Sequence, residues 1–332
     1  MGEIFRAFVV EELEHNIYQS KIMKRNTDDL VFGNVLIKVQ YSALNYKDAL
    51  SSRGHKGITR KYPHTPGIDA SGIVVESLSP KFNTGEEVLV TGYDLGMNTD
   101  GGFGEYIRVP AEWVVKLPQN LNLRESMIYG TAGFSAGICI YKLIKEGIAL
   151  ETGKILVTGA SGAVGSLAVA MLSKAGYYVI ASTGKASARQ FLIDLGAKEV
   201  ICREEVIDLS TKPLLNKRWA GVIDTVGGKT LTSAIRATVP RGLVCCLGLV
   251  DSDKLEVSVY PFILRGVMLT GIDSAEQPMD IRLAIWEKIA SEWKVPTLEL
   301  IKKEVTLDNL KDEIELILNG GQIGKVIVNM SK

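Results

Sequence analysis

The sequence has few cysteines and few histidines, and they are not arranged as a metal site. Its 332 residues include four cysteines and three histidines. No two cysteines stand in a C-x-x-C spacing, and no histidine pairs with a cysteine at ligand spacing. The cysteines are in apolar or strand-like segments, so we expect buried free thiols rather than disulfides or metal ligands: Cys139, Cys202, Cys245 and Cys246.

The chain also lacks an excess of charge and a long apolar run. Lys plus Arg and Asp plus Glu both number 38, which does not indicate nucleic acid or an anionic membrane as a partner. No run approaches the ~18 apolar residues of a membrane span. Residues 1–8 lack the cationic and apolar segments of a signal peptide. We therefore expect a cytoplasmic protein whose partner is a small molecule.

What the sequence does contain is a strand, a glycine-rich turn and a helix start in residues 154–165, KILVTGASGAVG. Glycines let the backbone approach a pyrophosphate closely, and the helix N-terminus faces the anion. The spacing of Gly159, Gly162 and Gly165 is G-x-x-G-x-x-G rather than G-x-G-x-x-G. A second apolar strand at 177–182 completes a βαβ unit. The pattern favours dinucleotide binding over a glycine-rich loop that binds nothing.

The order of elements predicts two domains of different kinds. Before about Leu123 the chain has short alternating strands and glycine, proline and asparagine turns, typical of a barrel-like β domain. Two helices follow, at 124–130 and 131–145, and then six strands alternate with helices up to residue 271, which predicts a doubly wound parallel α/β sheet. The last strand, 325–329, has no partner there, so we expect the tail to fold back onto the first domain. The predicted boundaries are 1–124, 125–272 and 273–332.

The residues after the strands indicate which dinucleotide is bound, because ligands lie at the carboxyl ends of the strands. An NAD site usually carries a carboxylate after the second strand, where this chain has Ser182, Thr183, Gly184 and Lys185. A hydroxyl and an ammonium suit a 2′-phosphate, so we favour NADPH over a solvated loop lysine. Arg203 follows the next strand and suits the adenine or the same phosphate, although a surface arginine fits the pattern equally well.

Two loops of the β domain carry polar groups. Residues 42–50, SALNYKDAL, interrupt an apolar pattern with acid, base and hydrogen-bonding groups. Taken alone, this stretch is more typical of a helix N-terminus with solvated Lys47 and Asp48 than of a site. Residues 62–72 form a rigid turn that enters a strand.

These motifs together resemble the medium-chain dehydrogenase/reductase superfamily, over nearly the whole chain. Its zinc alcohol dehydrogenases place a cysteine and a histidine where this sequence has Asn45 and Ile68, so the resemblance implies a zinc-free reductase. The segments 44–48, 129–134, 219–227 and 261–267 are similar to the acryloyl-CoA reductase subgroup of the zinc-free quinone oxidoreductases. The resemblance implies a Rossmann domain, a GroES-like barrel-type catalytic domain, and NADPH-dependent reduction of an activated C=C bond.

The resemblance also assigns residues by matching position. Tyr46 is expected at the nicotinamide end and Arg203 on the adenine side. The remaining expected contacts are Gly159, Ser161, Gly162, Ala163 and Val164 for the pyrophosphate, Thr183, Gly184 and Lys185 for the 2′-phosphate, and Leu249, Ile263 and Ser274 for the nicotinamide side. Ala163 replaces a glycine that is common in relatives.

The mechanism that this implies passes a hydride to the β-carbon of an α,β-unsaturated carbonyl compound. Tyr46 is the candidate hydrogen-bond donor, with Asn45 and Lys47 supporting it or meeting an anionic substrate tail. A quinone acceptor is the alternative, and a non-catalytic NADPH-binding regulatory or RNA-binding protein is a further one. The family also implies a homodimer formed through an edge strand near residues 255–259.

Overall fold

The computed structural model describes residues 2–14 and 16–331, and the chain divides into two compact units. Unit 1 comprises residues 1–131, 275–283 and 302–332, and unit 2 comprises residues 132–274 and 284–301. The C-terminal return to unit 1 is therefore interrupted. Residues 284–301 pack within unit 2 instead of joining one continuous return from 273 to 332.

Unit 2 is built on a parallel sheet in the order β10-β9-β8-β11-β12-β13, which confirms the predicted doubly wound Rossmann fold. The central strands are short and apolar, and β11 is buried along its whole length, as expected of strands covered on both faces. Successive strands are added on one side of β8 up to β10 and then on its other side from β11, so the strand order reverses between β8 and β11. The strands are β8 (Ile155–Val157), β9 (Val179–Thr183), β10 (Glu199–Cys202), β11 (Trp219–Asp224), β12 (Thr238–Cys246) and β13 (Met268–Gly271).

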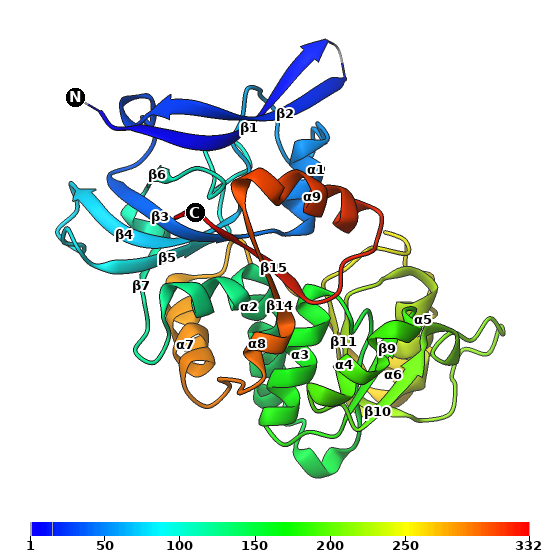
Figure 1. Cartoon of the computed structure of the whole chain (residues 1–332). Helices are drawn as coiled ribbons and strands as arrows, with labels where there is room; N and C mark the ends of the chain where they lie inside the picture. The colour runs from blue at the N-terminus through cyan, green and yellow to red at the C-terminus, as the bar shows by residue number, and fades with distance from the viewer. Residues whose placement is uncertain (1, 15, 332) are drawn as a thin grey trace. The chain divides into compact units, whose positions relative to one another are not determined.

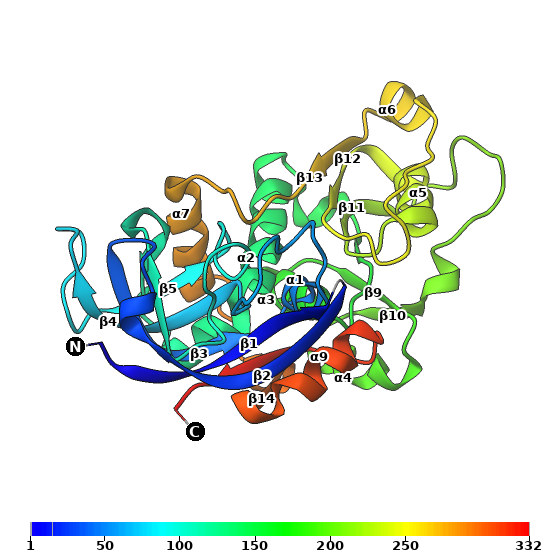
Figure 2. The ribbon, with the colours of Figure 1, turned by 90° about the horizontal axis from the view of Figure 1, so that it is seen from above.

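Helices connect these strands. Helix α3 contacts β8 and β9, α4 contacts β10, and α5 and α6 lie at the β11–β13 end of the sheet (Figure 2). Residues 255–259, where an edge strand was expected, form no strand, and β13 is the edge on that side. The bounds are α3 (Ala163–Lys174), α4 (Arg189–Asp194), α5 (Gly228–Ala237), α6 (Tyr260–Arg265), α7 (Met279–Ala290) and α8 (Leu298–Ile301).

Helix α2 (Leu123–Lys145) is one assigned helix with a break in the middle. Gly130 has φ 48° and ψ −155°, so the two helices predicted on either side of residue 130 are confirmed as two segments joined at a kink. By length and composition α2 could cross a membrane, but 78% of its most apolar 18-residue stretch is buried inside the protein. That burial is typical of a core helix.

Unit 1 contains a sheet in the order β14-β15-β3-β4-β5-β7, with β6 also paired to β3. Its strand pairs are antiparallel except for β14 and β15, which are parallel. The C-terminal strand β15 lies between β14 and β3, as Figure 1 shows in red, and Val328 is opposite Ser42. The predicted return of the tail is thus confirmed for this strand. The bounds are β3 (Val35–Ala43), β4 (Asp69–Ser77), β5 (Glu87–Thr91), β6 (Tyr106–Val109), β7 (Val114–Lys116), β14 (Lys302–Thr306) and β15 (Lys325–Asn329), with helices α1 (Tyr46–Ser52) and α9 (Leu310–Leu318).

A hairpin of β1 (Ile4–Glu14) and β2 (Ile17–Asn26) completes this unit. The sequence indicated a strand over residues 5–10 and gave no signal for β2. Every residue of β2 is exposed or half-buried. Tyr18, Ile22 and Met23 pack partly against the core, but polar residues stand on both faces of the strand, so the sequence lacks the regular alternation by which strands are recognised.

Candidate functional site

The glycine-rich turn of unit 2 lies at the point where the sheet order reverses. Gly159 follows β8, and the turn leads into α3 with Gly162 as its N-cap residue. The backbone N–H of Ala160 donates to the carbonyl oxygen of Ser182 at 2.9 Å, which ties the turn to the end of β9. Gly162 has no side chain to cap the helix, so the first-turn N–H groups can face an anionic ligand.

The three positions of the turn are occupied by glycine for different physical reasons. A Cβ on Gly159, which has φ +58°, would lie 2.2 Å from Oγ1 of Thr225, and one on Gly165 would lie 2.4 Å from the carbonyl oxygen of Gly159. Both positions are therefore required by the fold. A Cβ on Gly162 would have the carbonyl oxygen of Gly159, at 3.4 Å, as its nearest contact among the described residues, so the fold does not require this glycine.

This difference predicts separable effects of two substitutions. We expect Gly165→Ala to lower the free energy of unfolding by about 1–3 kcal/mol, because backbone atoms must move. We expect Gly162→Ala to change stability by less than about 1 kcal/mol and to weaken dinucleotide binding roughly 10-fold, because the methyl group points to where phosphate approaches. Thermal unfolding and calorimetric titration measure the two effects, and equal affinity in Gly162→Ala would contradict the assignment.

The predicted 2′-phosphate residues come together beside this turn. The hydroxyls of Ser161 and Thr183 lie 2.9 Å apart, and the N–H of Lys185 donates to Thr183 Oγ1 at 3.1 Å. Arg203 reaches back from the end of β10, and a Cβ on Gly184 would lie 3.2 Å from its Nη2. Partial burial and the nearby Arg203 charge lower the pKa of Lys185. Two neighbouring cations of this kind favour a dianionic ligand.

The residues expected on the nicotinamide side are on three separate elements. Leu249 follows β12, Ile263 is on α6, and Ser274 follows β13. The side chains of Leu249 and Ile263 are 65% and 72% exposed. Their contact with a cofactor stays a prediction.

In unit 1, the loop at residues 42–50 forms the start of α1, with Asn45 as N-cap. Asp48 is fully buried, and its carboxylate accepts from the N–H groups of Asn45, Gly67 and Ile68 at 2.8, 3.1 and 2.9 Å. The expectation that Asp48 is solvated is therefore wrong, because it links α1 to the loop before β4. Lys47 is half-buried.

A fully buried carboxylate and ammonium, which sequence reasoning missed, complete this cluster. Asp69 opens β4 and Lys325 opens β15, and Lys325 Nζ lies 3.6 Å from Asp69 Oδ2 with both side chains at 0% exposure. Asn45 bonds both, because its Nδ2 donates to Asp69 at 2.8 Å and its Oδ1 accepts from Lys325 at 2.7 Å. The one signal in the sequence was a charged residue at the start of each apolar strand.

Tyr46 is the residue after Asn45, and it differs from the cluster in being accessible. It is 48% exposed, and among the described residues no side chain or backbone group hydrogen-bonds its hydroxyl. The Asn45 side chain, by contrast, is committed to Asp69 and Lys325. The catalytic roles of Tyr46, Asn45 and Lys47 stay predictions, and the Tyr46 hydroxyl is available to donate a hydrogen bond.

Burial raises the pKa of Asp48 to about 7, against the lowering effect of its N–H donors, and the Asp69 charge raises it further. A carboxyl pKa raised by folding stabilises the protein below the unfolded pKa of 3.8, and this stabilisation is lost as pH rises to about 7. We expect the free energy of unfolding to fall by up to about 3 kcal/mol between about pH 5 and about pH 8.

Denaturant unfolding of Asp48→Asn across the same pH range provides the comparison. This variant is less stable overall because its amide meets the Asn45 N–H, but its profile lacks the Asp48 slope. Burial also raises the pKa of Asp224. Because Asp224 titrates in both proteins, the difference between the two profiles isolates Asp48, and parallel profiles would contradict the raised pKa.

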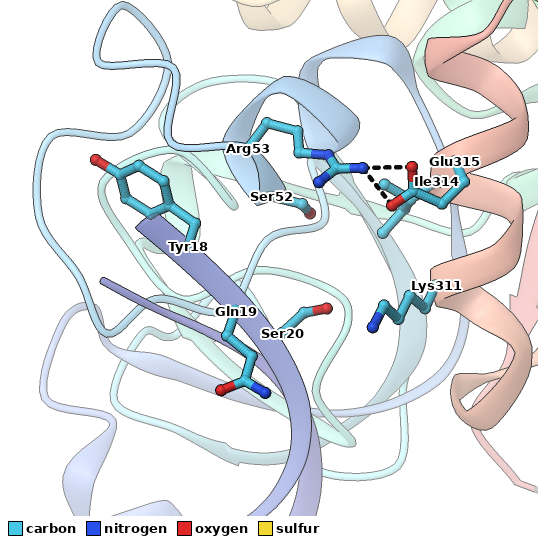
Figure 3. Close-up of a pocket in the computed structure, with 8 residues that line it drawn as sticks. All are labelled: Tyr18, Gln19, Ser20, Ser52, Arg53, Lys311, Ile314 and Glu315. Atoms are coloured by element: carbon cyan, nitrogen blue, oxygen red, sulfur yellow. Dashed lines mark hydrogen bonds and ion pairs between the residues drawn. The ribbon is translucent and has the colours of Figure 1, made fainter. Parts of the chain in front are cut away.

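Two other features do not belong to this site. A cavity of about 100 Å³ opens between β2, the end of α1 and α9 (Figure 3), where Arg53 is paired with Glu315. None of the predicted site residues lines it, since its walls are Tyr18, Gln19, Ser20, Ser52, Arg53, Lys311, Ile314 and Glu315. The cysteines are free thiols, but the prediction that all are buried is wrong for two of them, because Cys202 is exposed and Cys246 is half-buried.

Comparison with known proteins accounts for both units. Residues 32–119 match the alcohol dehydrogenase GroES-like domain, and residues 163–291 match the zinc-binding dehydrogenase domain. The putative quinone oxidoreductase YhfP of Bacillus subtilis is 45% identical over 99% of this chain and 100% of the relative. The acrylyl-CoA reductase AcuI of Ruegeria pomeroyi is 38% identical over 99% and 100%. This chain belongs to the medium-chain dehydrogenase/reductase family.

Solved structures place the chain in the same branch of the medium-chain dehydrogenases/reductases. The yhdH oxidoreductase of Salmonella enterica, in complex with NADP, matches with a TM-score of 0.95 and 38% identity over 98% of this chain and 99% of that one. The YhfP protein of Bacillus subtilis, with NAD bound, matches with a TM-score of 0.96 over 99% and 100%. These relatives confirm the predicted family, fold and class of enzyme.

The family name implies zinc, and the residues of this medium-chain enzyme do not fit it. Within residues 2–14 and 16–331, no group of three or more His, Cys, Asp or Glu side chains is placed to hold a metal ion. The buried carboxylates of Asp48 and Asp69 are already bonded to N–H donors and to Lys325. We therefore assign no step to a metal.

Proposed function

We propose that this protein is an NADPH-dependent reductase of an activated C=C bond, with acryloyl-CoA or a related enoyl thioester or enone as substrate. The observation that carries the cofactor assignment is the pair of cations, Lys185 and Arg203, beside Thr183 and next to the glycine-rich turn. The absence of a carboxylate from residues 182–185 agrees with it. The names of AcuI and the NADP complex of yhdH support the same proposal.

NADPH, when bound, supplies the hydride. The N–H groups at the start of α3 hold the pyrophosphate, with Gly159, Ser161, Gly162, Ala163 and Val164 forming the turn. Lys185 and Arg203 neutralise the 2′-phosphate. Tyr46 would donate a hydrogen bond from its hydroxyl to the substrate carbonyl oxygen, where negative charge develops, and would thereby stabilise the enolate until its α-carbon takes up a proton from water.

A quinone reductase is the second candidate, because the YhfP relative carries that name. An assay of NADPH oxidation with acryloyl-CoA, crotonyl-CoA, simple enones and quinones separates the two. The proposal predicts a higher kcat/KM for an enoyl thioester or enone than for any quinone. The reverse order would favour the quinone reductase, and no oxidation with any acceptor would remove the proposed function.

We also propose that the protein is a homodimer formed through β13, the edge strand of the unit 2 sheet. An edge strand with unpaired backbone groups is a template for pairing with a second copy. Exposed apolar side chains lie in the segments next to β13, namely Leu249, Val250, Val259, Tyr260, Ile263 and Leu264. We expect light scattering to give twice the chain mass and Leu269→Pro on β13 to yield monomers, because the Leu269 N–H points away from β12, whereas a monomeric native protein would contradict the proposal.

A further inference from the structure

The ion pair of Lys325 and Asp69 lies inside unit 1 without access to water. Burying a single charge without a partner is expensive, and removing one partner of a buried pair destabilises a protein strongly. Each charge here has several partners. Lys325 Nζ donates to the carbonyl oxygen of Leu44 at 3.1 Å and to Asn45 Oδ1 at 2.7 Å, in addition to its contact with Asp69.

Asp69 is the centre of a second set of bonds. Its carboxylate accepts from the N–H and the hydroxyl of Thr131 at 3.0 and 2.6 Å, directly after the kink of α2. A Cβ on Gly130 would lie 2.5 Å from Asp69 Oδ2, so the glycine makes room for the carboxylate. The ion pair thus joins β4, β15, the kink and the start of α1.

The chain itself supplies the cation of this cluster, one ammonium for two carboxyl groups. Asp48 and Asp69 are two buried carboxylates, and the Lys325 ammonium is the buried cation that faces them. Asp48 also accepts three backbone N–H bonds, so it depends less on the ammonium than Asp69 does. The amide of Asn45 lies between Lys325 and Asp69 and is held from both sides, which fixes the residue that precedes Tyr46.

We propose that Lys325 is a positioning residue: its ammonium is the resident counter-cation of Asp69, and the two hold Asn45 and the start of α1, with Tyr46, without a metal ion. The claim that Lys325 positions Tyr46 for turnover rests on the proposed function. The claim that Lys325 is the counter-cation of Asp69 does not rest on it and is tested separately.

A double-mutant cycle tests the charge. Lys325→Met keeps the length of the side chain and removes the ammonium, and Asp69→Asn removes the carboxylate. We expect Lys325→Met to lower the melting temperature by about 10 °C, because Asp69 is left as an unpaired buried charge. The double variant should lose less than Lys325→Met alone. Additive losses would overturn the role as counter-cation.

Removal of metal ions tests the claim that the cluster needs no metal ion. The native protein treated with EDTA should keep its melting temperature and its turnover, and metal analysis should find no stoichiometric zinc. A loss that Zn²⁺ restores would overturn the proposal.

Kinetics test the positioning. At a temperature where all variants are folded, we expect Lys325→Met and the double variant to lose kcat about 10-fold or more, with the dissociation constant for NADPH within about twofold of native. Val328→Ala is the matched control, because Val328 is buried on the same strand and its loss leaves a cavity but no unpaired charge. It should lower the melting temperature and keep kcat.

Chemical rescue separates position from mere loss of structure. Lys325→Ala with added methylammonium should regain part of its turnover. Unchanged kcat in both Lys325→Met and the double variant would overturn the positioning role. If the native protein reduced no acceptor, the proposed function would fail, while the stability cycle would still decide whether Lys325 is the counter-cation.

Discussion

Tyr46→Phe is expected to lower kcat about 100-fold or more, with little change in the affinity for NADPH. The substitution removes one hydroxyl from a residue that is 48% exposed at the start of α1. Loss of a single donor to a developing oxyanion costs roughly 10²- to 10³-fold in turnover. Steady-state kinetics with the best acceptor of the panel, together with NADPH titration, measure the two effects.

The matched control for this substitution is Tyr178→Phe. Tyr178 is 41% exposed and directly precedes β9, at the end of the sheet opposite to the glycine-rich turn, and its hydroxyl donates to Glu199 at 2.8 Å. We expect its kcat to equal that of the native enzyme. If Tyr46→Phe also kept native turnover, the hydroxyl would have no part in the mechanism and the hydrogen-bond donor to the carbonyl oxygen would have to be sought elsewhere.

Lys185→Glu is expected to reverse the preference between the two nicotinamide cofactors. A hydrogen bond to a charged group contributes about 1.5–3 kcal/mol, so loss of the ammonium alone weakens NADPH roughly 10- to 100-fold. The new carboxylate adds repulsion toward the 2′-phosphate and can accept from a ribose hydroxyl of NADH. The measurement is kcat/KM for both cofactors with one acceptor.

Lys198→Glu makes the same change of charge at the other end of the sheet, since Lys198 is exposed and precedes β10. It should leave the ratio of NADPH to NADH unchanged. This comparison matters because one close relative was solved with NADP and another with NAD. A native enzyme with equal kcat/KM for both cofactors would contradict the role of Lys185 as a selector.

Much of the fold followed from local patterns. The aliphatic runs of unit 2 are apolar on both faces, so their length and the turns between them were enough to predict six parallel strands, all of which lie in described residues. The glycine spacing after β8 likewise predicted the turn, and Gly130 marked the break in α2. Strand β2 was missed because polar residues occur on both of its faces, so apolar and polar residues do not alternate along it.

The sequence by itself determined the βαβ unit and the basic and hydroxyl residues after β9, because each depends on residues close together in the chain. Only the tertiary structure decided which charges meet. Lys325 and Leu44 are 281 positions apart, and no local period relates them. Asp48 and Lys47 are neighbours in a polar loop, yet one is buried and bonded and the other half-buried. Burial of a charge depends on partners that distant strands supply, which is why the Asp69–Lys325 cluster emerged from the folded chain alone.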